Sequence, residues 1–337
     1  MSQTSRIDPI ASPGGLSGHV HIFAGASNIN AQSTYESLLQ AACSSCEIQD
    51  DKSAYWTPLL YYQHSNGLFQ EVPNHGMAVY YLGRGSNKTL TPFPPGFRIV
   101  SGDKASRSYN NDKIIPGGKR PVSDRVNFAC LNGSPSKEEN GMAKTDCKDG
   151  MRAQVHFQSC WNGIDLYKPD NSHVEYLSGV DSGDCPDTHP VPLVHLFYEV
   201  LYGVNDIKKD GGKFVFSHGD TTGYGFHGDF MNGWKPDVLA EGIKQCAFSK
   251  DSSVQYCLPF KPSLDPSFSK TCPQQPPLDT EPVYGTIDKL PGCITVTSGP
   301  LDAQESDMNC ANGANGANGA NRSQTLSAPI RDCRSRI

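Results

Sequence analysis

The sequence predicts a mainly β protein, a sandwich of jelly-roll-like type with a few short helices and many disulfides; an α+β fold is the alternative. Of its 337 residues, 33 are Gly and 25 are Pro, a composition that favours many short strands joined by turns. Several stretches also alternate apolar and polar residues, or are apolar throughout, as strands do. The chain has 12 Cys, an even number that six disulfides in an oxidising compartment explain better than free thiols.

Two stretches have the clearest strand patterns. Residues 152–158 alternate, which predicts a half-buried strand with its polar residues, from Arg152 to Gln158, on one face. Residues 194–202 are apolar on both faces apart from His195 and Glu199, which predicts a central strand covered on both sides. Further strands are expected at residues 55–62, 77–82, 97–101 and 213–216.

Helical spacing of apolar residues is confined to residues 32–42 and 237–247, where Asp237 is expected to cap the helix after Pro236. We expect one β-rich body over residues 6–262. Residues 263–337 are expected to form a largely irregular tail, because they contain many prolines and an Ala-Asn-Gly repeat that cannot bury a core.

Cysteine spacing indicates some pairings but does not determine them all. Cys160 with Cys185 and Cys246 with Cys257 are plausible local bridges. The tail cysteines are expected to close small loops within the tail, and they are Cys272, Cys293, Cys310 and Cys333. The Cys43-Ser44-Ser45-Cys46 segment has no second pair at zinc-ribbon spacing, so a metal site there is the weaker interpretation.

Charge and hydropathy exclude two classes of partner. A net charge of -6 and a pI near 5.9 argue against nucleic acid, which needs a clustered basic surface. No apolar stretch approaches the roughly 20 residues that span a bilayer. Nothing in the sequence indicates an oligomeric state.

The cysteines predict an extracellular or cell-wall protein, and the glycosylation triplets at Asn87, Asn132 and Asn321 fit a secreted glycoprotein. Residues 1–8 lack the apolar run of a signal peptide. We therefore expect that a leader was removed or that the sequence starts beyond it; a cytosolic protein with reduced thiols is the alternative.

Two polar couplets in glycine-rich segments are the main candidates for a functional site: His19-Val20-His21 and His227-Gly228-Asp229. Residues two apart on a strand share a face, so each couplet presents its side chains together. His19, His21 and His227 are candidate ligands of a divalent metal, zinc or copper, with Asp229 as a further ligand or as a partner that orients a ring. An acid/base pair is one alternative for the histidines, and turn-capping rings held by backbone carbonyls are the other.

A catalytic centre for polysaccharide cleavage would combine these couplets with Asp220 and Tyr224. Hydrolysis needs two carboxyl groups, whereas elimination needs a base such as His227 or Tyr224. We therefore name five candidate catalytic residues: His19, Asp220, Tyr224, His227 and Asp229. An ordinary Asx turn is the alternative for Asp220.

Substrate contacts are expected from cations and tryptophans elsewhere in the body. Lys52, Arg98 or Arg152 could neutralise a uronate. Trp56 and Trp161 could stack on sugar rings, although Trp161 follows Cys160 and packing over a disulfide is its alternative role.

The chain resembles a fungal family of secreted proteins that is catalogued as a domain of unknown function and is often joined to WSC carbohydrate-binding modules. The resemblance rests on a series of short motifs: Arg6-Ile7-Asp8-Pro9-Ile10, Gly18-His19-Val20-His21, Cys43-Ser44-Ser45-Cys46, Asp51-Lys52-Ser53-Ala54-Tyr55-Trp56-Thr57-Pro58, Pro95-Gly96-Phe97-Arg98, Ser159-Cys160-Trp161-Asn162-Gly163, Thr188-His189-Pro190 and Gly223-Tyr224-Gly225-Phe226-His227-Gly228-Asp229-Phe230. It implies an extracellular location and a cell-wall or plant-polysaccharide setting.

The expected function is therefore a secreted hydrolase or lyase acting on a polysaccharide through a His/Asp/Tyr centre. A non-catalytic glycan-binding wall protein and a metal-binding protein are the alternatives. The sequence contains no nucleophile elbow, phosphate loop, His-Glu-x-x-His helix or dinucleotide fingerprint, which removes several common enzyme classes.

Overall fold

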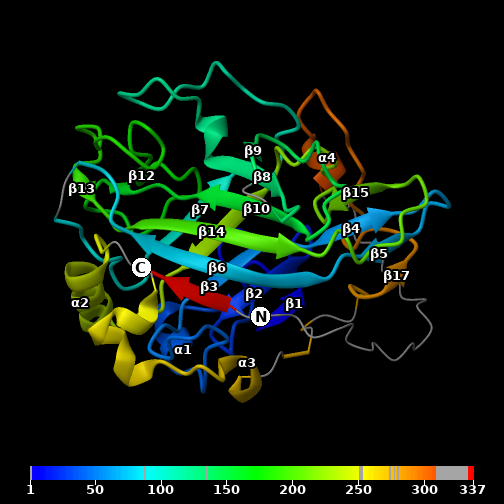
Figure 1. Cartoon of the computed structure of the whole chain (residues 1–337). Helices are drawn as coiled ribbons and strands as arrows, with labels where there is room; N and C mark the ends of the chain where they lie inside the picture. Colours follow the sequence, from blue (N-terminus) through cyan, green and yellow to red (C-terminus); the bar gives the residue numbers. More distant parts are fainter. Residues whose placement is uncertain are drawn as a thin grey trace.

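Two β-sheets pack face to face in the computed structural model (Figure 1). The model describes residues 2–86, 89–133, 136–249, 253–272, 275–276, 278, 281–308 and 333–337. The first sheet has the order β1-β2-β3-β16-β7, all antiparallel. Its strands are β1 (Gln3–Ser5), β2 (His21–Gly25), β3 (Ala54–Pro58), β7 (Arg98–Gly102) and β16 (His227–Met231).

The second sheet has the order β18-β6-β14-β10-β8-β9. Its strands are β6 (Asn74–Leu82), β8 (Val126–Cys130), β9 (Glu138–Glu139), β10 (Met151–His156), β14 (His195–Tyr202) and β18 (Cys333–Arg336). The C-terminal strand β18 runs parallel to β6, as the red arrow beside β6 in Figure 1 shows.

Two smaller sheets and short helices complete the described fold. The strands are β4 (Leu60–Gln63), β5 (Phe69–Glu71), β15 (Lys213–Phe216) and β17 (Thr286–Ile287) in one sheet, and β11 (Cys160–Trp161), β12 (Val174–Glu175) and β13 (Val191–Pro192) in the other. The helices are α1 (Tyr35–Leu39), α2 (Pro236–Cys246), α3 (Phe268–Thr271) and α4 (Glu305–Met308), with 3-10 turns at Val122–Arg125, Val254–Tyr256 and Leu258–Ser263. No helix in the described part of the chain has the length and apolar character needed to cross a membrane.

Strand alternation divides the first sheet into two buried faces. Ile22 and Phe230 point toward the second sheet and share one core with its Val155 and Tyr198. Phe23, Trp56 and Met231 point the other way, where the N-terminal segment and α1 cover them. This outer face of the first sheet carries the candidate site.

The fold class is confirmed, and most strand predictions agree with the structure. The predicted central strand is β14, which lies between β6 and β10. The segment 55–62 differs, because the chain breaks it into β3 and β4 at Leu59. The first predicted helix shortens to α1, which Thr34 caps. In α2, Pro236 occupies the first turn, so Asp237 lies inside the helix and does not cap it.

Five disulfides join described cysteines, and they include both predicted local pairs, Cys160–Cys185 and Cys246–Cys257. Cys130–Cys147 is a third local bridge. The loops expected within the tail are wrong for Cys272 and Cys333, which bond instead to Cys43 and Cys46. A bridge to Cys310, like the Ala-Asn-Gly repeat, lies outside the described residues.

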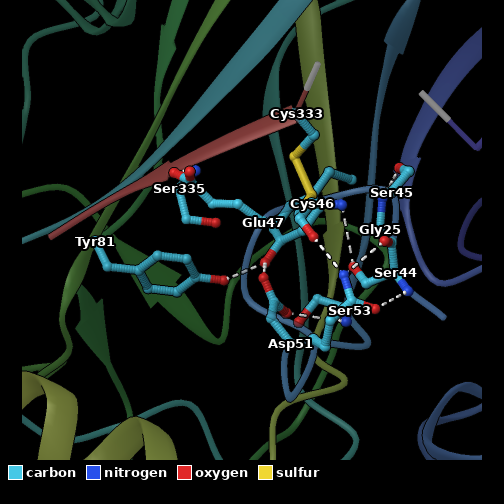
Figure 2. Close-up of a disulfide and its surroundings, with 12 residues drawn as sticks. Gly25, Ser44, Ser45, Cys46, Glu47, Asp51, Ser53, Tyr81, Cys333 and Ser335 are labelled. Atoms are coloured by element: carbon cyan, nitrogen blue, oxygen red, sulfur yellow. Dashed lines mark hydrogen bonds between the residues drawn. A yellow bond between two sulfur atoms is a disulfide. The ribbon is translucent and has the colours of Figure 1, made fainter. Parts of the chain in front are cut away.

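Figure 2 shows how the Cys46–Cys333 disulfide attaches β18 to the segment that follows β2. Ser335 of β18 also donates its backbone N–H to the carboxylate of Glu47, at 3.1 Å. Beside this disulfide, Asp51 accepts a hydrogen bond from the Tyr55 hydroxyl, which lies 2.6 Å from the hydroxyl of Tyr81. The last residues of the chain are therefore packed against the first half of the body.

Candidate metal centre

Four histidines and one aspartate gather on the outer face of the first sheet; we call this set the histidine centre. Its members are His19, His21, His218, His227 and Asp229. His21 shares a strand face with Phe23, and Asp229 shares one with Met231, so both point outward. The two predicted couplets do converge, although they are more than 200 residues apart in the chain.

The imidazole rings are in close contact. The Nε2 atoms of His19 and His227 lie 3.0 Å apart. The ring centroids of His19 and His21 are 4.3 Å apart, and those of His218 and His227 are 5.0 Å apart. All are buried: His19 and His227 are 4% and 5% exposed, and His21 and His218 are fully covered.

His218 is the member that sequence reasoning missed. It lies in a tight turn after β15, which Gly219 closes at φ 85° with a hydrogen bond to the Phe216 carbonyl. In the sequence it begins His218-Gly219-Asp220, which has the same spacing as the His227-Gly228-Asp229 couplet but lies in a turn and not on a strand. This repeated spacing was the available signal in the sequence. In the structure Gly225 lets the ring pack closely, because a Cβ there would lie 2.7 Å from His218 Nε2.

Backbone carbonyls orient two of the rings. His21 Nδ1 donates to the Ile7 carbonyl at 2.9 Å, and His227 Nδ1 donates to the Gly225 carbonyl at 2.9 Å. A neutral imidazole carries one N–H, so the Nε2 atom of each ring is left with a lone pair. The turn-capping alternative therefore accounts for one nitrogen of each ring. His227 Nε2 can accept a hydrogen bond from His19 Nε2 at 3.0 Å, whereas His21 Nε2 has no hydrogen-bond partner.

Several of the remaining polar atoms lack any partner. They are His21 Nε2, both ring nitrogens of His218 and Asp229 Oδ2, all buried. Leaving a buried polar atom without a hydrogen bond costs about 1–3 kcal/mol. A protein seldom gathers such atoms at one point, and these groups could hold a metal ion.

Burial keeps the imidazoles neutral. It lowers the pKa of His21 and His227 to about 3, and lowers the pKa of His19 and His218 well below the ordinary value. Burial also raises the pKa of Asp229, and nearby Asp8 raises it further. At neutral pH the rings thus present lone pairs, the form in which histidine binds metal.

These atoms form two groups of three in which every ligand atom lies within 4.8 Å of the others. One is His19, His218 and His227; the other is His21, His227 and Asp229. Two nitrogens bound to one ion at 2.0–2.1 Å in tetrahedral geometry lie roughly 3.3 Å apart, close to the observed His19–His227 separation. The residues present thus fit a transition-metal ion.

Of the other predicted catalytic residues, Asp220 borders the centre and Tyr224 does not. Asp220 Oδ2 lies 3.9 Å from His218 Nε2, and its Oδ1 accepts the Thr222 N–H, which matches the Asx-turn alternative. Tyr224 is half-buried and packs beside Gly141 and Tyr109 instead.

The predicted sugar-stacking residue Trp56 is fully buried against Phe23, so its ring cannot receive a sugar. Trp161 is half-buried, with its indole N–H bonded to the Asp165 carbonyl. Trp161 therefore does not lie beside the histidine centre, and its packing against Phe97 suits a structural role.

The three predicted cations are also dispersed. Lys52 lies just before the start of β3. The other end of that strand, at Pro58, is the one that pairs with His21. Arg98 starts β7 and stacks over Tyr167 at 4.7 Å. Arg152 lies on the second sheet, where it binds Glu138 and Glu199. Two other cations lie closer to the centre. Lys104 is an exposed residue two positions beyond Gly102, which pairs with His227, and buried Arg107 donates to the His218 carbonyl at 3.1 Å.

A family model described as "Domain of unknown function (DUF1996)" matches residues 8–234. The chain belongs to this family. No curated protein and no solved structure matches it. The family description assigns no activity, substrate or metal, but the DUF1996 match includes all five residues of the histidine centre.

Proposed function

We propose that this DUF1996 protein binds one divalent transition-metal ion, zinc or copper, at the histidine centre. The observation that carries the proposal is His218, a fully buried ring whose two nitrogens both lack partners while facing a group of neutral imidazoles. Imidazole nitrogen is a preferred ligand for both metals. A bound ion would supply the partner that the folded protein lacks.

The two ligand groups compete for a single ion. Both need His227, whose Nδ1 is engaged by the Gly225 carbonyl, so only Nε2 can coordinate. We assign His19, His218 and His227 as the ligands because neither ring nitrogen of His218 has a hydrogen bond, and an ion would engage the nitrogen that carries the lone pair. His21 and Asp229 then border the bound ion.

Metal content of the purified protein tests this proposal. We expect about one equivalent of zinc or copper per chain by elemental analysis, and saturable binding of the same ion by calorimetry after chelation. His227→Ala removes the residue common to both groups and should weaken binding more than 100-fold. His189→Ala, on a surface loop, is the matched control and should bind like the wild type.

Wild-type protein that takes up neither ion, or a His227→Ala variant that binds as tightly as the control, would refute the metal centre. Circular dichroism of each variant establishes that it is folded.

A polysaccharide-directed hydrolase or lyase reaction in an extracellular or cell-wall setting is the second candidate. Five disulfides support that setting, and exposed Lys104 beside the centre is a cation of the kind that neutralises a uronate. Among the predicted glycosylation sites, Asn132 is exposed, and Asn87 and Asn321 lie outside the described residues.

Metal-loaded protein incubated with uronate-containing and neutral polysaccharides tests this candidate. New reducing ends or unsaturated products that disappear in His227→Ala would support it. Saturable binding without products would support the glycan-binding alternative. If the protein neither binds nor cleaves these polysaccharides, metal binding is left as its function.

A further inference from the structure

A part of the chain beyond the family match lies against the histidine centre: residues 292–303, which we call the tail segment. Thr297 donates its backbone N–H to the Gly219 carbonyl at 2.8 Å, next to His218. Ala303 donates to the Ala105 carbonyl at 2.8 Å, in the loop after β7. A Cβ on Gly292 would lie 2.1 Å from the Gly18 carbonyl, so the tail segment also passes the residue before His19.

Arg107 lies between the tail segment and the centre, with its side chain completely buried. Its Nε donates to Thr297 Oγ1 at 2.7 Å, and its backbone N–H donates to Asp302 Oδ1 at 3.2 Å. One terminal nitrogen donates to the Lys104 and Ser106 carbonyls, both at 2.8 Å. The guanidinium is therefore fixed in one orientation.

The Arg107 guanidinium also connects to two of the proposed ligands, His218 and His227. Its second terminal nitrogen donates to the His218 carbonyl at 3.1 Å. Its Nε lies 3.7 Å from Asp220 Oδ1, and the other oxygen of that carboxylate accepts the Gly225 N–H at 2.8 Å. Gly225 in turn accepts the His227 ring N–H, so Arg107 contacts the backbone of His218 and, through Asp220, the turn that orients His227.

We infer that Arg107 is a positioning residue of the metal centre, and that the tail segment beyond the family match holds it in place. This inference rests on the proposed metal binding. When one nitrogen of His218 binds the ion, its other nitrogen carries the proton. The Asp220 carboxylate, 3.9 Å from Nε2, is a nearby acceptor toward which that N–H would have to move by a few tenths of an ångström to form a hydrogen bond. Carboxylates in this position orient a metal-bound histidine and commonly change metal affinity 10–100-fold.

Two substitutions test the assignment with the ligands intact. Arg107→Lys keeps the charge but loses the planar fork, so it cannot bond Thr297 and His218 together. Thr297→Val is nearly the same size and removes only the hydroxyl that accepts from Arg107. Arg120→Lys is the matched control, because Arg120 makes a comparable pair of bonds to Asp124 and Gly179 on the surface.

We expect zinc affinity to fall 10–100-fold in Arg107→Lys and about threefold to tenfold in Thr297→Val, with one equivalent still bound at saturation. The visible spectrum of the cobalt-substituted protein should shift in both variants, because the ligand geometry changes. A merely structural role would lower the melting temperature of the metal-free protein and leave this spectrum unchanged. Arg120→Lys should match the wild type throughout.

Wild-type affinity, within twofold, and an unchanged cobalt spectrum in both variants would overturn the positioning role while leaving metal binding intact. Failure of the wild type to bind metal would instead refute the proposed function. If Arg107→Lys does not fold, Thr297→Val decides the question alone.

Discussion

The protein contains two clusters of buried histidines, and their hydrogen bonding differs. In the second sheet, Ser159 Oγ lies 2.6 Å from His195 Nδ1, and His195 Nε2 lies 3.0 Å from His156 Nδ1. Both nitrogens of His195 therefore have partners. In the histidine centre, both nitrogens of equally buried His218 have none.

The two clusters differ in how many of their ring nitrogens are hydrogen-bonded within the protein. Burial alone does not distinguish them, since both sets hold fully covered rings whose pKa it lowers. The number of hydrogen bonds does, because both nitrogens of His195 are bonded within the protein and neither nitrogen of His218 is. Buried Ser159 is also closed to a substrate, so its contact with His195 serves packing.

The largest expected effect is a difference in stability between two variants in which the same substitution, His to Phe, is made once in each cluster. In metal-free protein, His195→Phe should lower the free energy of unfolding by about 3 kcal/mol, because it leaves His156 Nδ1 without its partner and removes the shorter of the two Ser159 Oγ bonds, keeping the 3.4 Å bond to the Phe157 carbonyl. His218→Phe breaks no hydrogen bond, and its effect should stay within about 1 kcal/mol. Urea denaturation of both variants measures the difference, and equal losses would contradict the comparison.

A third buried polar group, Asp51, extends the comparison to pH. It is fully bonded, by the Tyr55 hydroxyl and the Ser53 N–H, yet burial raises its pKa to about 6. A raised carboxyl pKa gives stability that is present below the unfolded value of 3.8 and is lost as pH rises through about 6.

Asp51→Asn cannot ionise, so its stability relative to the wild type should improve by about 3 kcal/mol between pH 4 and pH 7. Unfolding curves at both pH values measure this change, and Asp50→Asn, at a more exposed neighbour, serves as control. A constant difference between variant and wild type would show that Asp51 is not protonated in the folded state.

The smallest expected effect is the change in metal affinity between pH 7 and pH 5. Three ordinary imidazoles with pKa near 6.5 would lose on the order of 10⁴-fold in affinity between pH 7 and pH 5. The lowered pKa values of His19, His218 and His227 predict a change below about threefold. Calorimetry across this range measures it.

The same titration distinguishes the two ligand groups. If Asp229 coordinates the ion, it must first release its proton. Metal affinity of the wild type should then fall about tenfold for each unit by which the pH is lowered, and the affinity of Asp229→Asn should not. That outcome would move the ion to the group of His21, His227 and Asp229.

Local sequence patterns predicted what depends on neighbours in the chain. Alternation over residues 152–158 and the apolar run at 194–202 located β10 and β14, because a strand's period is a property of a few successive residues. Short loops between cysteines predicted Cys160–Cys185 and Cys246–Cys257 for the same reason. The His19–His21 and His227–Asp229 couplets were likewise recognisable from their spacing of two.

Contacts between distant segments followed only from the tertiary structure. Cys43 and Cys46 are close in sequence, yet they bond to separate tail residues, Cys272 and Cys333, and pairing of β18 with β6 positions Cys333. Arg107 has no local pattern that marks it, and the spacing of His218-Gly219-Asp220 does not show which residues His218 meets. The contact between them joins a turn and a loop that are more than a hundred positions apart. The sequence by itself thus determined the strands, the local bridges and the chemistry of the couplets. The packing of the sheets decided which side chains meet, because that depends on burying apolar faces across the whole chain.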